Sequence, residues 1–550
     1  MAEDYNVGDL VAEFIAACDV STVFGIVSIH NIPMLDAIAR RNSLRFVMAR
    51  GEMGAGHMAD GFSRASGHLG VLITSTGPGA ANAVPALVEA NFASSPVLHI
   101  TSQTSTKFID RDLGTVHDVP GQADMLRAIC KSHYRVRTAQ EAFALLQRAA
   151  TDAVSTPSGP VSIEIPIDIQ RTVIERPAGL DTFKLTATPP VVPGLQAIDD
   201  LAAMVAKARR PMLWTGSGAR HAGVAIAKLL DMGFCMVTSW DGRGVVSEDH
   251  PQNLGGLNGV GSSGIEAFYE TVDLMIVVGS RLRGHETLDF TVPLPKNRVH
   301  IDIDPRADGR NYTNNLFVRG DSALTLEALV DRVEGSFKVA PSYVDEFAKM
   351  KTASKNSFRD SLGAYATFSE QLRAALPKDG IFVRDITLSH STWGNRLFPV
   401  HGPRDSIYPV GAAIGPGLQL GIGASLGGGG RKVVSVCGDG GFMLNAMELW
   451  TAAQEQVDIV IVVMNDGGYG VIKHIQDASY GGRRNYGDLA APDFEKFAAL
   501  AGVGFWKVTA ANSFGPAVSE ALAAGGPALV EVDMKAVGDM PPFFPYGPKT

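Results

Sequence analysis

The sequence has few cysteines and no long apolar run. Its 550 residues include four cysteines, and these show no paired spacing that would indicate a disulfide framework. No apolar stretch has the roughly 20 residues that span a bilayer. The start, MAEDYNVGDL, lacks the basic and apolar parts of a secretory signal. We therefore expect a soluble cytoplasmic protein whose thiols are reduced and structural; they are Cys18, Cys130, Cys235 and Cys437.

Charge is also sparse and scattered. Charged residues make up 19% of the chain, and the formal net charge is −9. A modest negative charge without clusters argues against nucleic acid or an acidic membrane surface as a partner. Hydrophobic residues make up 45% of the chain, which is enough for large cores and unlike the composition of disordered proteins.

Two breaks divide the chain into three segments. Ala187–Gly194 is rich in proline, and in Glu334–Leu362 the content of charge, serine and lysine rises. We therefore expect domains near residues 1–186, 190–335 and 360–550. Each alternates short Val/Ile-rich runs with alanine-rich stretches, a pattern that predicts an α/β fold with doubly wound parallel sheets.

Acids and glycines follow two predicted strands of the last segment. The β-branched runs Val433–Val436 and Val457–Val463 predict buried parallel strands, and Asn445–Gln454 between them predicts a helix. Asp439 and Asp466 each come just after a strand, so we expect them to meet at one edge of the sheet. Two carboxylates beside glycines suit Mg²⁺ that also holds a diphosphate. An Asp-Gly pair is also common as a plain turn.

This arrangement resembles the diphosphate-anchoring motif of thiamine diphosphate (ThDP) enzymes, in which Gly-Asp-Gly is followed one strand later by a pair of asparagines. The resemblance implies Mg²⁺ ligands at Asp439, at Asp466 and at the carbonyl of Gly468. The chain departs from the motif because Asn465-Asp466 stands where Asn-Asn is usual. An acid still offers oxygen ligands. The residues that would bind the cofactor here are Gly438, Asp439, Gly440, Gly441, Asp466, Gly468, Tyr469 and Gly470.

The first segment has an acid at the start of a predicted helix. Ser43–Val47 predicts a strand and Gly51–Ala65 a helix of small residues, with Glu52 in its first turn. Such an acid often serves only to favour the helix dipole. However, Ala59 to Arg64 read Ala-Asp-Gly-Phe-Ser-Arg, which resembles the run after the catalytic glutamate of the acetolactate synthase, pyruvate oxidase and 2-oxo acid decarboxylase family. The resemblance implies that Glu52 activates ThDP and that the site forms between two subunits of a homodimer or homotetramer.

Other parts of the first segment resemble the same family. Ile73–Asn82 is similar to the turn that faces the pyrimidine ring, although an ordinary Gly-Pro turn has the same sequence features. His30 matches in position a catalytic histidine of benzaldehyde lyase, although loop histidines are often merely solvated. Gln122 lies near the family's catalytic Gln or Glu. The resemblance implies cofactor contacts from Thr76, Gly77, Pro78 and Asn82, and catalytic roles for His30 and Gln122.

The middle segment predicts strands at Asp273–Gly279 and Arg298–Asp304. Related enzymes hold FAD, ADP or no ligand in this domain. Trp214–Gly218 and Ser280–Arg281 are the residues that we expect to face such a nucleotide. A glycine-rich stretch alone is weak support, and a purely structural domain fits the sequence equally well.

The last segment continues the resemblance. Asp385–Trp393 lies where the family's diphosphate-contacting loop begins, which implies contacts from Thr387, Ser389 and His390. Pro409–Ala424 is similar to the stretch that holds the residue wedged between the two rings of the cofactor. That position is Ile414, and a plain core isoleucine would look the same.

The motifs that bind the cofactor resemble those of the family, whereas the residues that select the substrate differ from those of acetolactate synthases. Ile475 stands where acetolactate synthases have a selectivity tryptophan, and His285 stands at their carboxylate-binding arginine. We therefore expect a ThDP- and Mg²⁺-dependent enzyme acting on a small carbonyl compound. It decarboxylates a 2-oxo acid and then releases an aldehyde or acts as a carboligase. The alternatives are a lyase that splits 2-hydroxy ketones without loss of CO₂, which His30 favours, and a non-catalytic ThDP-binding protein.

Overall fold

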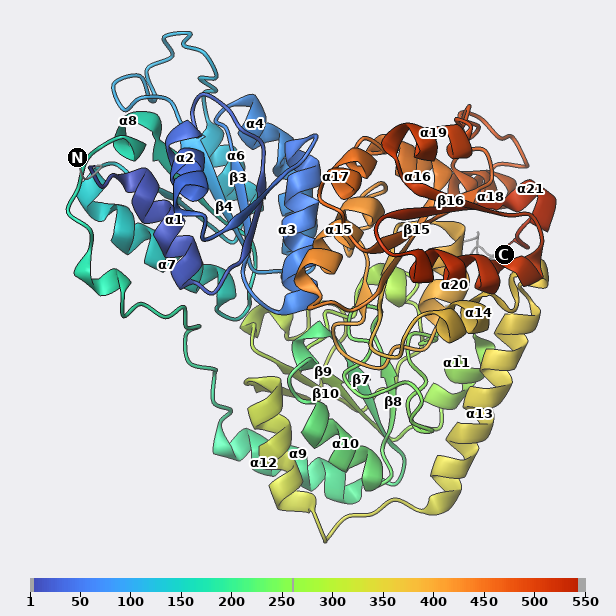
Figure 1. Ribbon diagram of the computed structural model, residues 1–550. Coiled ribbons are helices and arrows are strands. Elements are labelled where there is room, and N and C mark those ends of the chain that lie inside the picture. The colour runs from blue at the N-terminus through green and yellow to red at the C-terminus, as the bar shows by residue number, and fades with distance from the viewer. Residues whose placement is uncertain (1–3, 260–261, 543–550) are drawn as a thin grey trace.

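The computed structural model describes residues 4–259 and 262–542. It folds into three α/β units, each built on a wholly parallel sheet flanked by helices (Figure 1), which confirms the predicted fold class. The outer ends of the first and third expected domains, residues 1–3 and 543–550, lie outside the described residues. The domain limits themselves stay predictions.

The first unit has a six-stranded sheet in the order β2-β1-β3-β4-β6-β5. Its strands are β1 (Thr22–Gly25), β2 (Arg45–Met48), β3 (Gly70–Thr74), β4 (Val97–Gln103), β5 (Ser132–Arg135) and β6 (Val161–Pro166). Its helices are α1 (Val7–Ala17), α2 (Ile32–Arg41), α3 (Glu52–Ser66), α4 (Pro78–Asn82), α5 (Val84–Phe92), α6 (Gln122–Ile129), α7 (Ala142–Val154) and α8 (Ile167–Gln170). The central strands β3, β4 and β6 are buried on both faces, as β-branched runs in a covered parallel sheet require.

The middle unit has a five-stranded sheet in the order β11-β10-β9-β7-β8. Its strands are β7 (Pro211–Thr215), β8 (Cys235–Thr238), β9 (Leu274–Val278), β10 (Arg298–Asp302) and β11 (Leu316–Arg319). Its helices are α9 (Leu195–Lys207), α10 (Gly223–Asp231), α11 (Ser263–Tyr269) and α12 (Ser322–Val333). The two strands predicted from the sequence in this region are β9 and β10.

The third unit has a six-stranded sheet in the order β13-β12-β14-β15-β17-β16. Its strands are β12 (Ile381–Arg384), β13 (Ser406–Ile407), β14 (Val433–Gly438), β15 (Ile459–Asn465), β16 (Gly504–Val508) and β17 (Ala528–Asp533). Its helices are α14 (Phe368–Ala375), α15 (Gly417–Gly427), α16 (Asp439–Leu444), α17 (Glu448–Gln454), α18 (Gly470–Ser479), α19 (Phe494–Ala501), α20 (Phe514–Ala524) and α21 (Met534–Val537). The helix predicted at Asn445–Gln454 is α17, which begins three residues later, at Glu448, and a separate short helix that was not predicted, α16, starts directly at Asp439.

The break expected at Glu334–Leu362 contains a regular helix that was not predicted. Residues 341–360 form α13 (Pro341–Asp360), which runs along the side of the molecule from the middle unit to the third (Figure 1). Tyr343, Phe347 and Phe358 recur at helical spacing and are buried. The many lysines and serines between these residues form the exposed face of an amphipathic helix, which is why the sequence pattern did not predict it.

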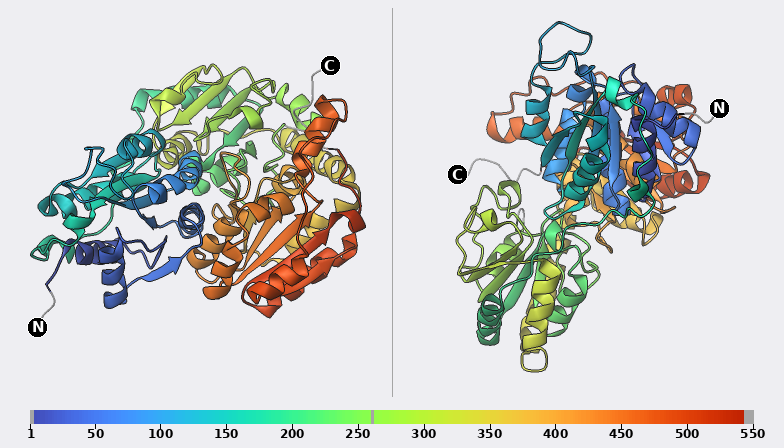
Figure 2. Two further views of the ribbon diagram at one scale, coloured as in Figure 1. Left: turned by 90° about the horizontal axis from the view of Figure 1, so that it is seen from above. Right: turned by 90° about the vertical axis from the view of Figure 1, so that its left-hand side faces the viewer.

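The first and third units lie side by side, with the middle unit against both (Figures 1 and 2). Helix α3 packs closely on α15, because small residues face each other. A Cβ at Gly427 would lie 2.6 Å from the carbonyl oxygen of Phe62, so only glycine allows this approach. The predicted helix of small residues therefore serves as the contact between the two units.

All four cysteines are buried free thiols, as expected. Within residues 4–259 and 262–542 we find no helix with the length and apolarity that a membrane span requires.

Candidate active site

The Gly-Asp-Gly turn (residues 438–441) lies where β14 ends, next to the end of β15. The two strands pair in parallel, with Gly438 opposite Met464. Asp439 is 1% exposed, and neither of its carboxylate oxygens makes a hydrogen bond of ordinary geometry among the described residues, although the N–H groups of Asp466 and Gly468 lie near enough to act on its pKa. Burial, and then the nearby charge of Asp466, raises the pKa of Asp439 to about 7. Buried carboxylate oxygens without partners are rare in folded proteins, and a cation would satisfy them.

Close packing of glycines brings the second loop against this turn. A Cβ at Gly440 would lie 2.8 Å from the ring of Tyr469 and 3.2 Å from the carbonyl oxygen of Gly468. A Cβ at Gly470 would collide with the carboxylate of Asp466. Gly468 itself has φ +151°, which side chains rarely allow.

The structure therefore brings together the three expected metal ligands. No group of three or more His, Cys, Asp or Glu side chains that suits a metal occurs in the described part of the chain, and the expected set is two carboxylates and a backbone carbonyl. Two carboxylates and one carbonyl are the hard oxygen donors that Mg²⁺ prefers, and diphosphate oxygens and water would supply the rest. The residues present fit Mg²⁺ and a diphosphate.

The loop after β12 borders the same turn. The methyl group of Thr387 would lie 3.3 Å from a Cβ at Gly438. Ser389 Oγ and His390 Nδ1 are buried without a partner among the described residues. The imidazole of His390 lies 5.1 Å from the ring of Tyr408, and its Nε2 bonds Asn395 at 3.0 Å. These unpaired polar atoms agree with the predicted diphosphate contacts, which stay predictions.

Two acids that the sequence analysis missed fix the loop of Ile414. Asp385 accepts hydrogen bonds from the N–H groups of Gly415 and Gly417, and Glu89 of the first unit accepts them from Gly411 and Ala413. Asp385 directly follows β12, just as Asp439 follows β14, and that position was the available signal.

Ile414 is a half-exposed apolar residue on this tightly held loop. A core isoleucine would be buried, so the exposure of Ile414 disagrees with a plain core role. Its role as the residue between the two cofactor rings stays a prediction.

Glu52 begins α3 and faces α4. Its Oε2 accepts a hydrogen bond from Asn82 Nδ2 at 3.2 Å, and its Oε1 would lie 3.1 Å from a Cβ at Gly79. The carboxylate therefore lies beside the Gly-Pro turn (residues 75–79), in which Pro78 starts α4. Glu52 and the turn that it was expected to accompany at the active site therefore lie together within the first unit.

Gln122 and Thr76 support this turn from inside the unit. Gln122 Oε1 accepts hydrogen bonds from the N–H of Gly77 (2.6 Å) and from Thr76 Oγ1 (3.0 Å), and its Nε2 donates to Glu164 (2.7 Å). Glu164 is ion-paired with Arg135. The amide of Gln122 thus helps to hold the turn, and its expected catalytic role and the cofactor contact of Thr76 stay predictions.

His30 lies on the loop between β1 and α2 and is 7% exposed. Its Nδ1 is 3.3 Å from Nδ1 of His117, a residue that the sequence analysis missed because it lies on a long loop without a motif. Both histidines flank the Gly-Pro turn.

Comparison with known proteins agrees with this geometry. The N-terminal TPP binding domain of thiamine pyrophosphate enzymes matches residues 5–126, their central domain matches 198–329, and their C-terminal TPP binding domain matches 388–532. The chain belongs to the thiamine pyrophosphate, or ThDP, enzyme family.

Named relatives cover most of the chain. A probable 2-ketoarginine decarboxylase of Pseudomonas aeruginosa is 32% identical over 471 residues, 85% of this chain and 83% of the relative. The acetolactate synthase isozyme 1 large subunit of Escherichia coli is 28% identical over 98% of this chain and 96% of its own length. A probable acetolactate synthase large subunit of Methanocaldococcus jannaschii is 27% identical over 98% of this chain and 93% of its own length.

In this member of the ThDP enzyme family a cavity of about 210 Å³ lies at the carboxyl ends of the strands of the middle unit, where ligands of such sheets bind, and residues 92–94 and 156–158 of the first unit also line it. Gly216, Ser217, Gly218, Ser280 and Arg281 line it, as predicted. Trp214 and Thr215 do not, because both are buried, and Trp214 Nε1 donates a hydrogen bond to Ser280 Oγ. Whether FAD, ADP or no ligand belongs there stays a prediction.

His285 and Ile475, the positions of the two selectivity residues of acetolactate synthases, do not provide a positively charged site for a substrate carboxylate. Burial, and then the charges of Arg283 and Arg396, lowers the pKa of His285 to about 3. A neutral imidazole offers no positive charge to a substrate carboxylate. Ile475 is half-buried on α18.

Proposed function

We propose that this chain is a ThDP- and Mg²⁺-dependent enzyme that decarboxylates a 2-oxo acid and then releases an aldehyde or joins the fragment to a second carbonyl compound. The observation that carries the proposal is the buried carboxylate of Asp439, unpaired beside Asp466 and the carbonyl of Gly468. Bound ThDP supplies a nucleophilic carbon and takes up the electron pair of the broken bond.

The chain's own residues have separable tasks. Asp439, Asp466 and the carbonyl of Gly468 would hold Mg²⁺ and through it the diphosphate. Glu52 would hold and exchange a proton at the pyrimidine N1′ atom. Ile414 would press on the cofactor from a loop that two buried acids keep in place.

Two observations favour simple decarboxylation over acetolactate synthesis. His285, half-buried and with a lowered pKa, stands where acetolactate synthases carry an arginine, and Ile475 replaces their tryptophan. One relative is named a probable 2-ketoarginine decarboxylase, so a 2-oxo acid with a long cationic side chain joins pyruvate as a candidate substrate.

The second candidate is a lyase that splits 2-hydroxy ketones without loss of CO₂. The specific observation that favours it is the buried His30 beside the Gly-Pro turn. Its position gives a proton-transfer group to a hydroxyl-bearing substrate.

We also propose that the enzyme is a homodimer or homotetramer with each site at a dimer interface. Val27 and Ile29 are exposed on the loop of His30, and Ile414, Leu444 and Met447 are exposed beside the Gly-Asp-Gly turn. Apolar residues therefore border both halves of the site, and a second subunit would cover them.

Nuclear magnetic resonance of the purified protein with ThDP and Mg²⁺ tests the reaction. Pyruvate, 2-ketoarginine and acetoin are supplied separately, and the carbon-containing products are identified. We expect one of the 2-oxo acids to disappear with release of CO₂ and formation of an aldehyde or a hydroxy ketone. If both 2-oxo acids persist while acetoin is cleaved, the second candidate replaces the first.

A further inference from the structure

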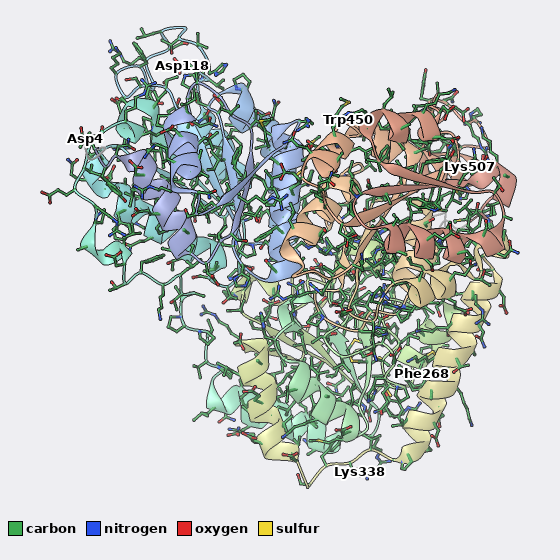
Figure 3. All side chains as sticks on the ribbon, in the orientation of Figure 1. Asp4, Asp118, Phe268, Lys338, Trp450 and Lys507 are labelled. Atoms are coloured by element: carbon green, nitrogen blue, oxygen red, sulfur yellow. The ribbon has the colours of Figure 1, made fainter. Side chains whose placement is uncertain are left out.

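The contact between His30 and His117 joins two loops that are distant in sequence. The ring centroids are 5.1 Å apart, and the shortest polar contact runs from Nδ1 to Nδ1 at 3.3 Å. His30 belongs to the loop after β1, whereas His117 belongs to the loop between β4 and α6. The second loop projects from the first unit, where Figure 3 labels the next residue, Asp118.

Both histidines are anchored to the candidate active site through the backbone. The N–H of His30 donates to Ser28 Oγ at 3.2 Å, and Ser28 Oγ donates to Ser75 Oγ at 2.6 Å. The carbonyl oxygen of His117 would lie 2.5 Å from a Cβ at Gly77. Ser75 and Gly77 belong to the Gly-Pro turn, and Glu52 lies beside Gly79 at the end of the same turn.

His117 has a φ of +64°. This left-handed conformation costs a residue with a side chain about 1 kcal/mol or more. The surrounding contacts therefore hold the backbone of His117 in an unfavourable conformation, and in that conformation its ring meets His30. Strain of this kind concentrates at functional sites.

A contact between two Nδ1 atoms requires one donor and one acceptor. The two rings therefore share a single proton between them, and its position fixes the tautomer of each. Neither Nε2 atom has a hydrogen-bond partner among the described residues, so both outer nitrogens are free for other partners. His30 is buried and His117 half-buried, so the pair leads from the interior toward the surface.

We propose that His117 is a positioning residue that sets the tautomer of His30 and exchanges its proton with solvent during the reaction. This inference deepens the proposed function and rests on it for the substrate. When Nε2 of His30 accepts a proton, the proton on its Nδ1 passes to Nδ1 of His117, and His117 releases its Nε2 proton to water. The reverse sequence delivers a proton. One proton enters and one leaves, and no electrons are transferred.

The charges around the pair agree with this role. Burial, and then His117 and Arg171, lowers the pKa of His30. These are the titratable and charged groups that act on it, and both disfavour a lasting positive charge. A neutral His30 can alternate between donating and accepting at Nε2 without a stable imidazolium, which is what a relay needs.

The wild-type holoenzyme is compared with His117→Asn. Asparagine is chosen because its amide can bond Nδ1 of His30 but cannot pass a proton. His68→Asn is the matched control, since His68 is exposed at the far end of α3. Long-range ¹H–¹⁵N spectra of ¹⁵N-histidine-labelled protein with ThDP and Mg²⁺ report the tautomer and titration of His30, whose signal is assigned by its loss in His30→Gln.

We expect His117→Asn to lock His30 in one tautomer and to move its titration to higher pH, because the repulsion from His117 is gone. Turnover of the accepted substrate should fall about 10- to 100-fold, at the lower range of proton-transfer effects, with a changed pH profile and little change in KM. His68→Asn should alter neither.

An unchanged tautomer and titration of His30 in His117→Asn would overturn the positioning role. Altered spectra with unchanged turnover and pH profile would overturn the relay. If the wild type converts no 2-oxo acid or 2-hydroxy ketone, the proposed function fails, and the spectra still decide whether His117 controls His30.

Discussion

The two halves of the candidate site, in the first and third units, differ in how their polar groups are hydrogen-bonded. In the first unit, the polar groups around the Gly-Pro turn are bonded to one another: Gln122 to Gly77, and Asn82 to Glu52. In the third unit, Asp439 and Ser389 keep buried oxygens without partners among the described residues. Unpaired buried groups are costly unless a ligand completes them. The first half therefore suits an organic ring, whereas the second half suits the ion and the anion proposed above.

The largest effect should come from Glu52→Gln. The amide keeps the hydrogen bond to Asn82 but cannot exchange a proton with the cofactor. We expect turnover to fall about 100- to 10,000-fold, the usual range for loss of a general acid or base. Binding of ThDP and Mg²⁺, measured by calorimetry, should change little.

Glu495→Gln supplies the matched control, because Glu495 is also a first-turn glutamate and is exposed at the start of α19. It should leave turnover unchanged. Full turnover by Glu52→Gln would show that Glu52 is only a helix-start acid.

The two acids of the metal site should differ in their effect on binding. Asp439→Asn removes the buried carboxylate, and Asp466→Asn only restores the asparagine pair that is usual in the family. We expect Asp439→Asn to weaken Mg²⁺-dependent ThDP binding by more than the roughly 10- to 100-fold that follows loss of an outer-shell partner. Asp466→Asn should have a much smaller effect, because an amide oxygen remains a ligand.

Calorimetric titration with ThDP at fixed Mg²⁺, and again with EDTA, measures the difference. Equal losses in the two variants would mean that the net charge of the site, rather than the buried carboxylate of Asp439, controls binding.

The sequence predicted those parts of the molecule that depend on local pattern. The strands around Asp439 and Asp466 follow from β-branched runs, and the meeting of the two acids follows from parallel strand geometry. Helix α13 was missed because lysines and serines fill its exposed face.

The residues that hold the site were harder to find. Glu89 and His117 matter through contacts with residues distant in sequence, namely Gly411 and His30. No periodicity or spacing in one sequence encodes such contacts, so only the folded chain shows them.

The smallest expected effect concerns how the stabilities of the first and third units change as the pH falls. In the first unit, burial lowers the pKa of His57 and of His99 to about 3. Between pH 6.5 and 3 the unfolded chain binds protons there that the native chain does not. The free energy of unfolding therefore falls as the pH falls, by up to about 1.4 kcal/mol per pH unit for each histidine. The pKa of Glu164 is lowered, because hydrogen bonds and charges from His133 and Arg135 outweigh the opposite effect of burial. Glu164 therefore also lowers the free energy of unfolding as the pH falls, but at lower pH.

The first unit has an acid that opposes these histidines, Asp60, whose pKa burial raises to about 6. In the third unit the opposing acids are Asp385 and Asp439. Burial raises the pKa of Asp385 to about 6, so between pH 3.8 and 6 the native chain holds a proton that the unfolded chain has released, and acid is stabilising. His390, whose pKa burial lowers, acts in the other direction. We therefore expect hydrogen exchange, corrected for its chemical pH dependence, to accelerate more in the first unit than in the third when the pH falls from about 7 to about 5. His57→Gln should reduce that difference. Faster opening of the third unit would contradict the prediction, because its buried acids would then not offset His390.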